Sequence, residues 1–156
     1  MSPEILEIEP MAPDALTCLA AYYEELDRTF PSGFDPGPIT ADGMDQLRRP
    51  LGLFLVARNK TGPIGCVGLR GDGSATGEVK RLWVSKAARG AGLAKSLMRT
   101  VEDQARGFGM DRLVLDTSRH LPKAVAFYRD QGWTEIARYN DNPYAHHFFE
   151  KRLAGG

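Results

Sequence analysis

Arg89, Gly90 and Gly92 stand where a predicted strand ends and a predicted helix begins. β-branched, aliphatic and aromatic side chains mark the strand over residues 79–84, and apolar residues recur every four positions from Leu93 onward. The first turn of a helix has N–H groups without partners, and glycine lets an anion approach the bare backbone. Arginine adds a permanent cation with forked donors. This bend therefore predicts a phosphate-binding site.

The bend fits neither of the common glycine-rich nucleotide motifs. No Lys-Ser or Lys-Thr pair follows Gly92 at the P-loop spacing. The sixth residue counted from Gly90 is Lys95, where a dinucleotide-binding fingerprint has glycine. A nucleotide-binding module therefore remains only as a weaker alternative.

Length and composition limit the classes of protein to consider. We expect residues 1–156 to form a single domain, because a chain of this length buries roughly two-thirds of its unfolded surface. Twenty basic and twenty acidic side chains cancel, which argues against nucleic acid or a membrane as the main partner. No apolar run approaches a membrane span. Cys18 and Cys66 are too few for a disulfide framework, so we expect buried thiols in a cytoplasmic protein.

The elements that must position the bend form a mixed α/β pattern. We expect strands at 5–9, 53–57, 64–69, 79–84, 113–115, 133–139 and 148–153, and helices from about Asp14, over 40–48, over 93–106 and from Pro122. A helix joins strands 79–84 and 113–115, so these two must run parallel, while the other neighbours are antiparallel. Val79, Leu82 and Val84 are spaced three and then two apart, which predicts a bulge near Lys80 and Arg81.

Two motifs together resemble the GNAT superfamily of N-acetyltransferases. Residues 89–94 read R-x-x-G-x-A, which is similar to the pyrophosphate loop of that family, and residues 124–133 resemble its A-x-x-x-Y-x-x-x-G-F ending. Residues 22–26, 33–36 and 78–82 look like a small, single-domain bacterial branch. The element order β-α-α-β-β-β-α-β-α-β-β is also that of the family, so the likeness covers nearly the whole chain.

The resemblance implies acetyl-CoA as the cofactor, held where the central parallel strand pair splays apart. In the family, the bulge frees backbone groups for the pantetheine amides and the thioester carbonyl. The tyrosine of the second motif, here Tyr128, lies beside the sulfur of coenzyme A. The cofactor-binding residues implied in this way are Leu82, Trp83, Val84, Arg89, Gly90, Ala91, Gly92, Leu93, Ala94, Phe127 and Tyr128.

Acetyl transfer to an amine needs a base, an oxyanion donor and an acid. A lysine-like ammonium with a pKa of about 10.4 costs roughly 4–5 kcal/mol to deprotonate at pH 7. Glu78 is the candidate base, because it matches the strand position where some lysine acetyltransferases carry their catalytic glutamate. In the alternative interpretation, Glu78 is a solvated carboxylate paired with Lys80, and a chain of water molecules takes the proton of the amine. Tyr128 is the candidate acid, with a core aromatic residue as the alternative. The Val84 backbone N–H would be the oxyanion donor.

The acceptor side is less marked in the sequence. Phe30, Phe34, Tyr139 and Asn142 are our candidate substrate-binding residues, because the first two helices and the last hairpin flank the acceptor in the family. Plain packing explains each of the four equally well. The histidines predict no zinc site, because His146 and His147 are adjacent on a strand and face opposite ways, and His120 has no matched partner.

The leading functional prediction is an acetyl-CoA-dependent N-acetyltransferase. It would move an acetyl group to a primary amine of a small molecule or amino acid, directly in a ternary complex, with no metal and no acyl-cysteine. The alternatives are a protein lysine or N-terminal acetyltransferase and a non-catalytic acyl-CoA-binding sensor. Dimers are common in the family, so a homodimer stays open.

Overall fold

The computed structural model describes residues 3–37 and 42–153, with the backbone alone at 42 and 43. In this part of the chain, seven strands form one sheet in the order β1-β2-β3-β4-β5-β7-β6. The elements are β1 (Glu4–Glu7), α1 (Pro13–Thr29), η1 (Asp42–Leu47), β2 (Leu53–Asn59), β3 (Gly62–Arg70), β4 (Thr76–Val84), η2 (Lys86–Ala88), α2 (Leu93–Gly107), β5 (Arg112–Thr117), α3 (Pro122–Asp130), β6 (Thr134–Ile136) and β7 (His147–Arg152). The predicted order is confirmed, with the second helix reduced to the 3-10 helix η1.

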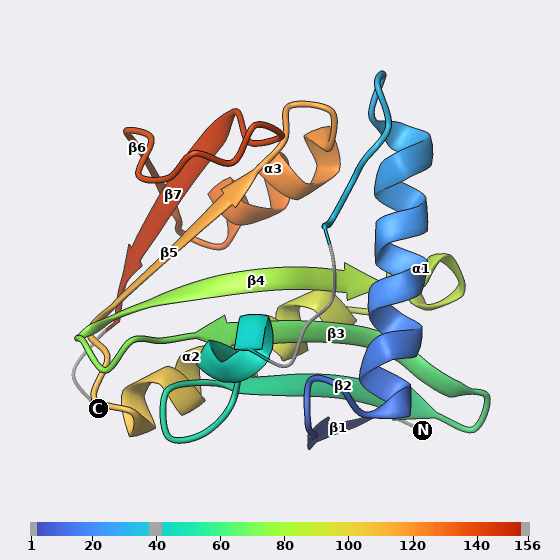
Figure 1. The fold of residues 1–156 in the computed structure, drawn as a ribbon, viewed down its shortest axis with the longest axis horizontal. Coiled ribbons are helices and arrows are strands. Elements are labelled where there is room, and N and C mark those ends of the chain that lie inside the picture. The colour runs from blue at the N-terminus through green and yellow to red at the C-terminus, as the bar shows by residue number, and fades with distance from the viewer. Residues whose placement is uncertain (1–2, 38–41, 154–156) are drawn as a thin grey trace.

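Helices cover both faces of the sheet, so its central strands are buried on both sides (Figure 1). Successive side chains of a strand point to opposite faces. On β2, Phe54 and Val56 accordingly pack with α1 and η1, whereas Leu53 and Leu55 pack with α2. Cys18 and Cys66 are free, buried thiols, as predicted, in the cluster beneath α1.

A bulge interrupts β4 at the predicted place. Gly68 pairs with Lys80 and Cys66 with Trp83, so two residues of β4 oppose one residue of β3 between these pairs. Arg81 has a φ of 58° there, a left-handed conformation that a side chain makes costly by about 1–2 kcal/mol. The extra residue brings Val79, Leu82 and Val84 to the same face, where all three pack on the core beneath α2.

The parallel pair β4 and β5 is joined only at its beginning. Thr76, Gly77 and Glu78 pair with Arg112, Leu113 and Val114, and no further pairs between these strands occur among the described residues. Beyond this point the two strands diverge, as Figure 1 shows. β5 instead stays paired with β7 along its whole length. The ends of β4 and β5 therefore enclose a wedge between them.

Several predicted boundaries differ from the structure. The first strand ends at Glu7 rather than Glu9. The strand predicted over 133–139 is limited to Thr134–Ile136. After it, the Arg138 guanidinium donates to the carbonyls of Asn140, Asn142 and Ala145 and lies over the Phe148 ring. These contacts fold the chain into a loop. Thr40, the predicted helix cap, lies outside the described residues. In the described ranges, every helix is too short or too polar to cross a bilayer.

Candidate active site

A cavity of about 750 Å³ occupies the wedge between β4 and β5. Its size is within the usual range for sites that bind small molecules. The ends of both strands line it, together with α1, the start of α2, α3 and the loop that follows β6. The cavity therefore connects the predicted phosphate site with the predicted acceptor side.

One end of the cavity is the start of α2. The first intrahelical hydrogen bond runs from Ser96 N to Gly92 O at 3.0 Å, so the N–H groups of residues 93–95 precede it, and no side chain caps the helix. Gly90 and Gly92 have φ values of 87° and 81°, and a Cβ at either position would meet nothing within 4 Å. This bare, open backbone with unpartnered donors fits a diphosphate.

The backbone of Val84 faces the wedge. Ser85 N donates to Ile64 O at 2.8 Å, so Ser85 and Ile64 form a hydrogen-bonded pair of the β3–β4 ladder. Hydrogen-bonded and non-hydrogen-bonded pairs alternate in an antiparallel ladder. The next pair, Val84 with Gly65, is therefore non-hydrogen-bonded, and the Val84 N–H and carbonyl point away from β3. An oxyanion donor in this place can act on a group bound between the strands.

Arg89 is engaged by other parts of the protein. Its Nε donates to the Val84 carbonyl at 2.9 Å, and its Nη2 donates to both carboxylate oxygens of Glu25, at 2.6 and 2.7 Å. Glu25 also accepts the indole N–H of Trp83 at 2.9 Å. Glu25 thus joins α1 to β4 and to the loop before α2. A phosphate would compete with Glu25 for Arg89, so direct phosphate binding by Arg89 stays a prediction.

Tyr128 presents a hydroxyl to the cavity from α3. Its ring packs against Trp133 and Phe149, and only 7% of the residue is exposed. Within the described chain the hydroxyl has no hydrogen-bond partner. Burial and the Asp116 carboxylate raise the pKa of Tyr128 above its usual value of about 10. Tyr128 therefore keeps its proton at neutral pH and can donate a hydrogen bond.

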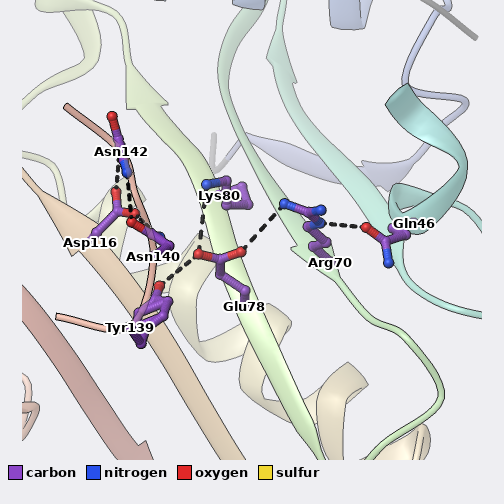
Figure 2. A network of polar contacts seen from close by, with 8 residues as sticks. All are labelled: Gln46, Arg70, Glu78, Lys80, Asp116, Tyr139, Asn140 and Asn142. Carbon is purple, nitrogen blue, oxygen red and sulfur yellow. Dashed lines mark hydrogen bonds and ion pairs between the residues drawn. The ribbon is translucent and has the colours of Figure 1, made fainter. Parts of the chain in front are cut away.

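Glu78 lies outside the cavity, which does not support its predicted role as the base. It accepts a hydrogen bond from the Tyr139 hydroxyl at 2.6 Å and lies 3.6 Å from the Lys80 ammonium and 3.7 Å from the Arg70 guanidinium (Figure 2). Neither Glu78 nor Tyr139 is among the described residues that line the cavity. Glu78 instead holds the loop after β6 against β4.

Asp116 is a cavity-lining carboxylate that sequence reasoning missed. It lies near the end of β5 and accepts hydrogen bonds from Asn140 Nδ2 at 2.6 Å and Asn142 Nδ2 at 3.2 Å (Figure 2). Its neighbour Leu115 packs in the core beneath α2, so the Asp116 side chain points to the opposite face of the sheet, the α1 side. The sequence signal was weak, because Asp116 follows an apolar strand and its partners are 24 and 26 residues away.

The far end of the cavity is an aromatic wall, made of Phe30, Phe34 and Tyr144. The centroids of Phe34 and Tyr144 are 4.7 Å apart, and those of Phe30 and Tyr144 are 5.6 Å apart in a stacked arrangement. Asp35 N donates to the Tyr144 hydroxyl at 3.0 Å. These contacts join the end of α1 to the loop after β6. Tyr144 was not predicted as a site residue.

His120 lines the cavity, whereas His146, His147 and the two cysteines are not among the described residues of the lining. His146 Nδ1 accepts the Arg119 N–H at 3.1 Å, and His147 lies 2.7 Å from a Glu135 oxygen. No group of three or more metal-binding side chains occurs in the described ranges. Burial raises the pKa of the Cys66 thiol, which keeps it protonated and makes it a poor nucleophile.

Most of the predicted site residues meet in the cavity. The predicted cofactor-binding residues that line it are Leu82, Trp83, Val84, Arg89, Gly90, Ala94, Phe127 and Tyr128. Ala91, Gly92 and Leu93 belong to the same bend but are absent from the described lining. Of the predicted acceptor residues, Phe30, Phe34 and Asn142 line the cavity and Tyr139 does not.

The similarities to known proteins concern acetyltransferases of one family. Residues 19–133 match the model of the acetyltransferase (GNAT) family. The chain is 33% identical over 134 residues, covering 83% of it and 87% of the relative, to a protein of Azospirillum brasilense named IAA acetyltransferase. Its fold is similar to an acetyltransferase of the GNAT family from Staphylococcus aureus, with a TM-score of 0.80, 18% identity and coverage of 98% and 100% of the two chains.

A second solved structure shares the fold. It is N-acetylglutamate synthase from Neisseria gonorrhoeae in complex with coenzyme A and N-acetyl-glutamate, with a TM-score of 0.72 and 18% identity. The match covers 97% of this chain and 35% of the synthase. At this identity the likeness concerns the fold alone.

Proposed function

Because the chain belongs to the GNAT family of acetyltransferases, we propose that it moves the acetyl group of acetyl-CoA to the primary amine of a small molecule or an amino acid. The transfer is direct and occurs in a ternary complex. One observation carries the proposal: the outward-facing backbone of Val84 lies in a cavity that also contains the Tyr128 hydroxyl and reaches the start of α2.

The cofactor end of the cavity has the groups that acetyl-CoA requires. The unpartnered amides at the start of α2 and the open backbone at Gly90 and Gly92 would hold the diphosphate. The outward-facing backbone of β4 near Val84 would bind the amides of the pantetheine arm, beside Phe127. When bound, acetyl-CoA supplies a thioester that an amine can attack.

Two groups of the chain act on the reacting atoms. The Val84 N–H donates a hydrogen bond to the carbonyl oxygen, which becomes negative as the amine attacks. The Tyr128 hydroxyl donates a hydrogen bond to the departing sulfur. Because the pKa of Tyr128 is raised above about 10, while a thiol has a pKa of about 8.5, full proton transfer from Tyr128 to the thiolate is uphill. Tyr128 therefore stabilises the thiolate as a hydrogen-bond donor.

The acceptor amine loses its proton to water rather than to Glu78. Glu78 is not among the described residues that line the cavity, and its carboxylate is engaged by Tyr139, Lys80 and Arg70. Two carboxylates occur among the described residues that line the cavity: Glu25 is occupied by Arg89 and Trp83, and Asp116 is placed to orient the amine. The rate should then rise with pH toward the pKa of the substrate amine, because the neutral amine becomes more abundant.

The test combines turnover with binding. The protein is mixed with acetyl-CoA and a panel of amines, amino acids and a lysine-containing peptide, and released coenzyme A is measured with a thiol reagent. Thermal shift with acetyl-CoA, ATP and NAD measures which ligand stabilises the fold. We expect stabilisation by acetyl-CoA and amine-dependent release of coenzyme A. Binding without release above background would identify a sensor, and turnover of the peptide alone would identify a protein acceptor.

A further inference from the structure

Asp116 is an acidic group in the cavity without a cationic partner. Glu25, the other acid that lines the cavity, forms an ion pair with Arg89 at 2.6 Å. Asp116 accepts hydrogen bonds from the neutral amides of Asn140 and Asn142, and no lysine or arginine of the described chain forms an ion pair with it. Its negative charge is therefore available to a cationic group bound in the cavity.

Arg81 is a corresponding basic group; Lys123, at the start of α3, also lines the cavity without an acidic partner among the described residues. It lies in the bulge of β4, is half-buried, lines the cavity and donates from Nε to the Tyr23 hydroxyl at 2.8 Å. In the described ranges it has no acidic partner within ion-pair distance. Lys80, its neighbour, is paired with Glu78. Arg81 thus presents a forked, positively charged donor that suits a carboxylate.

The aromatic wall of Phe30, Phe34 and Tyr144 completes this part of the cavity. All three residues line it, and Phe30 is only 8% exposed. Aromatic rings gain most from contact with another ring or a large apolar group. This part of the cavity therefore combines an acid and a base that each lack an oppositely charged partner among the described residues, beside an apolar face.

We propose that the acceptor is an amino acid with an aromatic side chain. Its amino group binds Asp116, its carboxylate binds Arg81, and its ring packs on the aromatic wall of Phe30, Phe34 and Tyr144. The inference rests on the proposed function and specifies its acceptor. A simple amine leaves Arg81 without an anionic partner, a small or polar amino acid leaves the aromatic wall uncovered, and a lysine side chain in a protein brings no carboxylate to the same place.

The first experiment uses the unmodified protein and acceptors that differ by one group. Phenylalanine, tyrosine and tryptophan are compared with phenethylamine, tyramine and tryptamine, which lack the carboxylate, and with alanine, glutamate and lysine, which lack the ring. Removing one hydrogen-bonded charged partner typically costs about 10- to 100-fold. We expect kcat/KM for the aromatic amino acids to exceed that for both comparison sets by at least about tenfold.

The second experiment assigns the carboxylate contact. Arg81→Gln should lower the preference for phenylalanine over phenethylamine by about tenfold or more, mainly through KM for phenylalanine. Arg28→Gln is the matched control, because Arg28 is an exposed residue of α1 that pairs with Glu24 outside the cavity, and it should leave the preference unchanged. Thermal unfolding of both variants verifies that they fold; if Arg81→Gln does not fold, the acceptor panel decides alone.

The outcomes separate this inference from the proposed function. If amines are acetylated but phenethylamine matches phenylalanine, or alanine matches it, the aromatic amino acid is wrong and the acetyltransferase stands. An unaltered preference in Arg81→Gln overturns the role of Arg81. If acetyl-CoA binds and no acceptor releases coenzyme A, both proposals fail.

Discussion

The two ends of the cavity are built in different ways. The proposed cofactor end offers mainly backbone groups: the open bend that begins at Gly90, the amides at the start of α2 beside it, and the outward-facing groups of Val84. The acceptor end consists of side chains from α1, β4, β5 and the loop after β6. A backbone site depends on local chain geometry, which glycine controls, whereas a side-chain site depends on residue identities far apart in the sequence. The two ends should therefore respond to different substitutions.

The largest effect is expected where the two ends meet. Tyr128→Phe removes the proposed donor to the departing sulfur and should lower kcat by about 100-fold. The ring remains packed against Trp133 and Phe149, so the dissociation constant of acetyl-CoA, measured by calorimetry, should stay within about twofold. Unchanged turnover would remove Tyr128 from the mechanism, and a large loss of affinity would assign the hydroxyl to cofactor binding.

The next effect tests the backbone end. Gly92→Ala places a side chain at a φ of 81°, which should lower the free energy of unfolding by about 1–2 kcal/mol and weaken acetyl-CoA binding by about tenfold as the bend relaxes. Gly73→Ala is the matched control. Gly73 has a φ of 89° in the β3–β4 turn, and its Cβ would also meet nothing within 4 Å.

Both glycine variants should therefore lose similar stability in chemical denaturation. Only Gly92→Ala should lose affinity for acetyl-CoA, measured at a temperature where both variants are folded. Equal affinities in the two variants would show that the bend at Gly92 does not contact the cofactor.

A smaller effect is expected from Glu78. If Glu78 positions the loop that carries Asn140 and Asn142, Glu78→Gln should lower kcat/KM by about fivefold, which corresponds to one hydrogen bond, and the pH–rate profile should keep its position. A glutamine at position 78 still accepts a hydrogen bond from Tyr139 but without the charge, whereas Tyr139→Phe removes the bond itself, so Tyr139→Phe should give a loss at least as large. A pH–rate profile that shifts in Glu78→Gln but not in Tyr139→Phe would establish Glu78 as the base after all.

The smallest effect is expected from Glu135, which lies away from both ends of the cavity and serves as a control. His147 and Arg129 lower the pKa of Glu135, a surface residue of β6. A carboxyl whose pKa is lowered by folding stabilises the protein above its unfolded pKa of about 4.3, and this contribution disappears as the pH falls through the folded pKa. Glu135→Gln should therefore cost about 0.5 kcal/mol at pH 7 and nothing near pH 3.

Denaturant unfolding at the two pH values measures this difference. Activity at pH 7 should remain that of the unmodified protein, because Glu135 is not part of the described lining of the cavity. A loss of activity as large as that of Glu78→Gln would mean that stability, rather than position, explains the smaller effects.

The backbone end was more predictable than the acceptor end for a physical reason. A bulge, a glycine bend and a helix start each leave a local signal, so the irregular spacing of Val79, Leu82 and Val84 was enough to predict the bulge that the structure contains. Asp116 leaves no such signal, because its role depends on asparagines that only the loop after β6 brings near. The predicted length of β6 was wrong for the same reason. Arg138 folds the loop after β6 through contacts that leave no periodic pattern in the sequence.

Because β4 and β5 pair at only three positions, the sheet is open between the remaining parts of these two strands. Past Glu78, two inner strand edges face each other with backbone groups turned into the space between them, as Val84 shows. An extended molecule that carries amides along its length can serve there as an eighth strand, in the manner of β-augmentation. Deuterium exchange at the Val84 amide should then slow when such a molecule binds. Binding of the molecule would complete the sheet between β4 and β5.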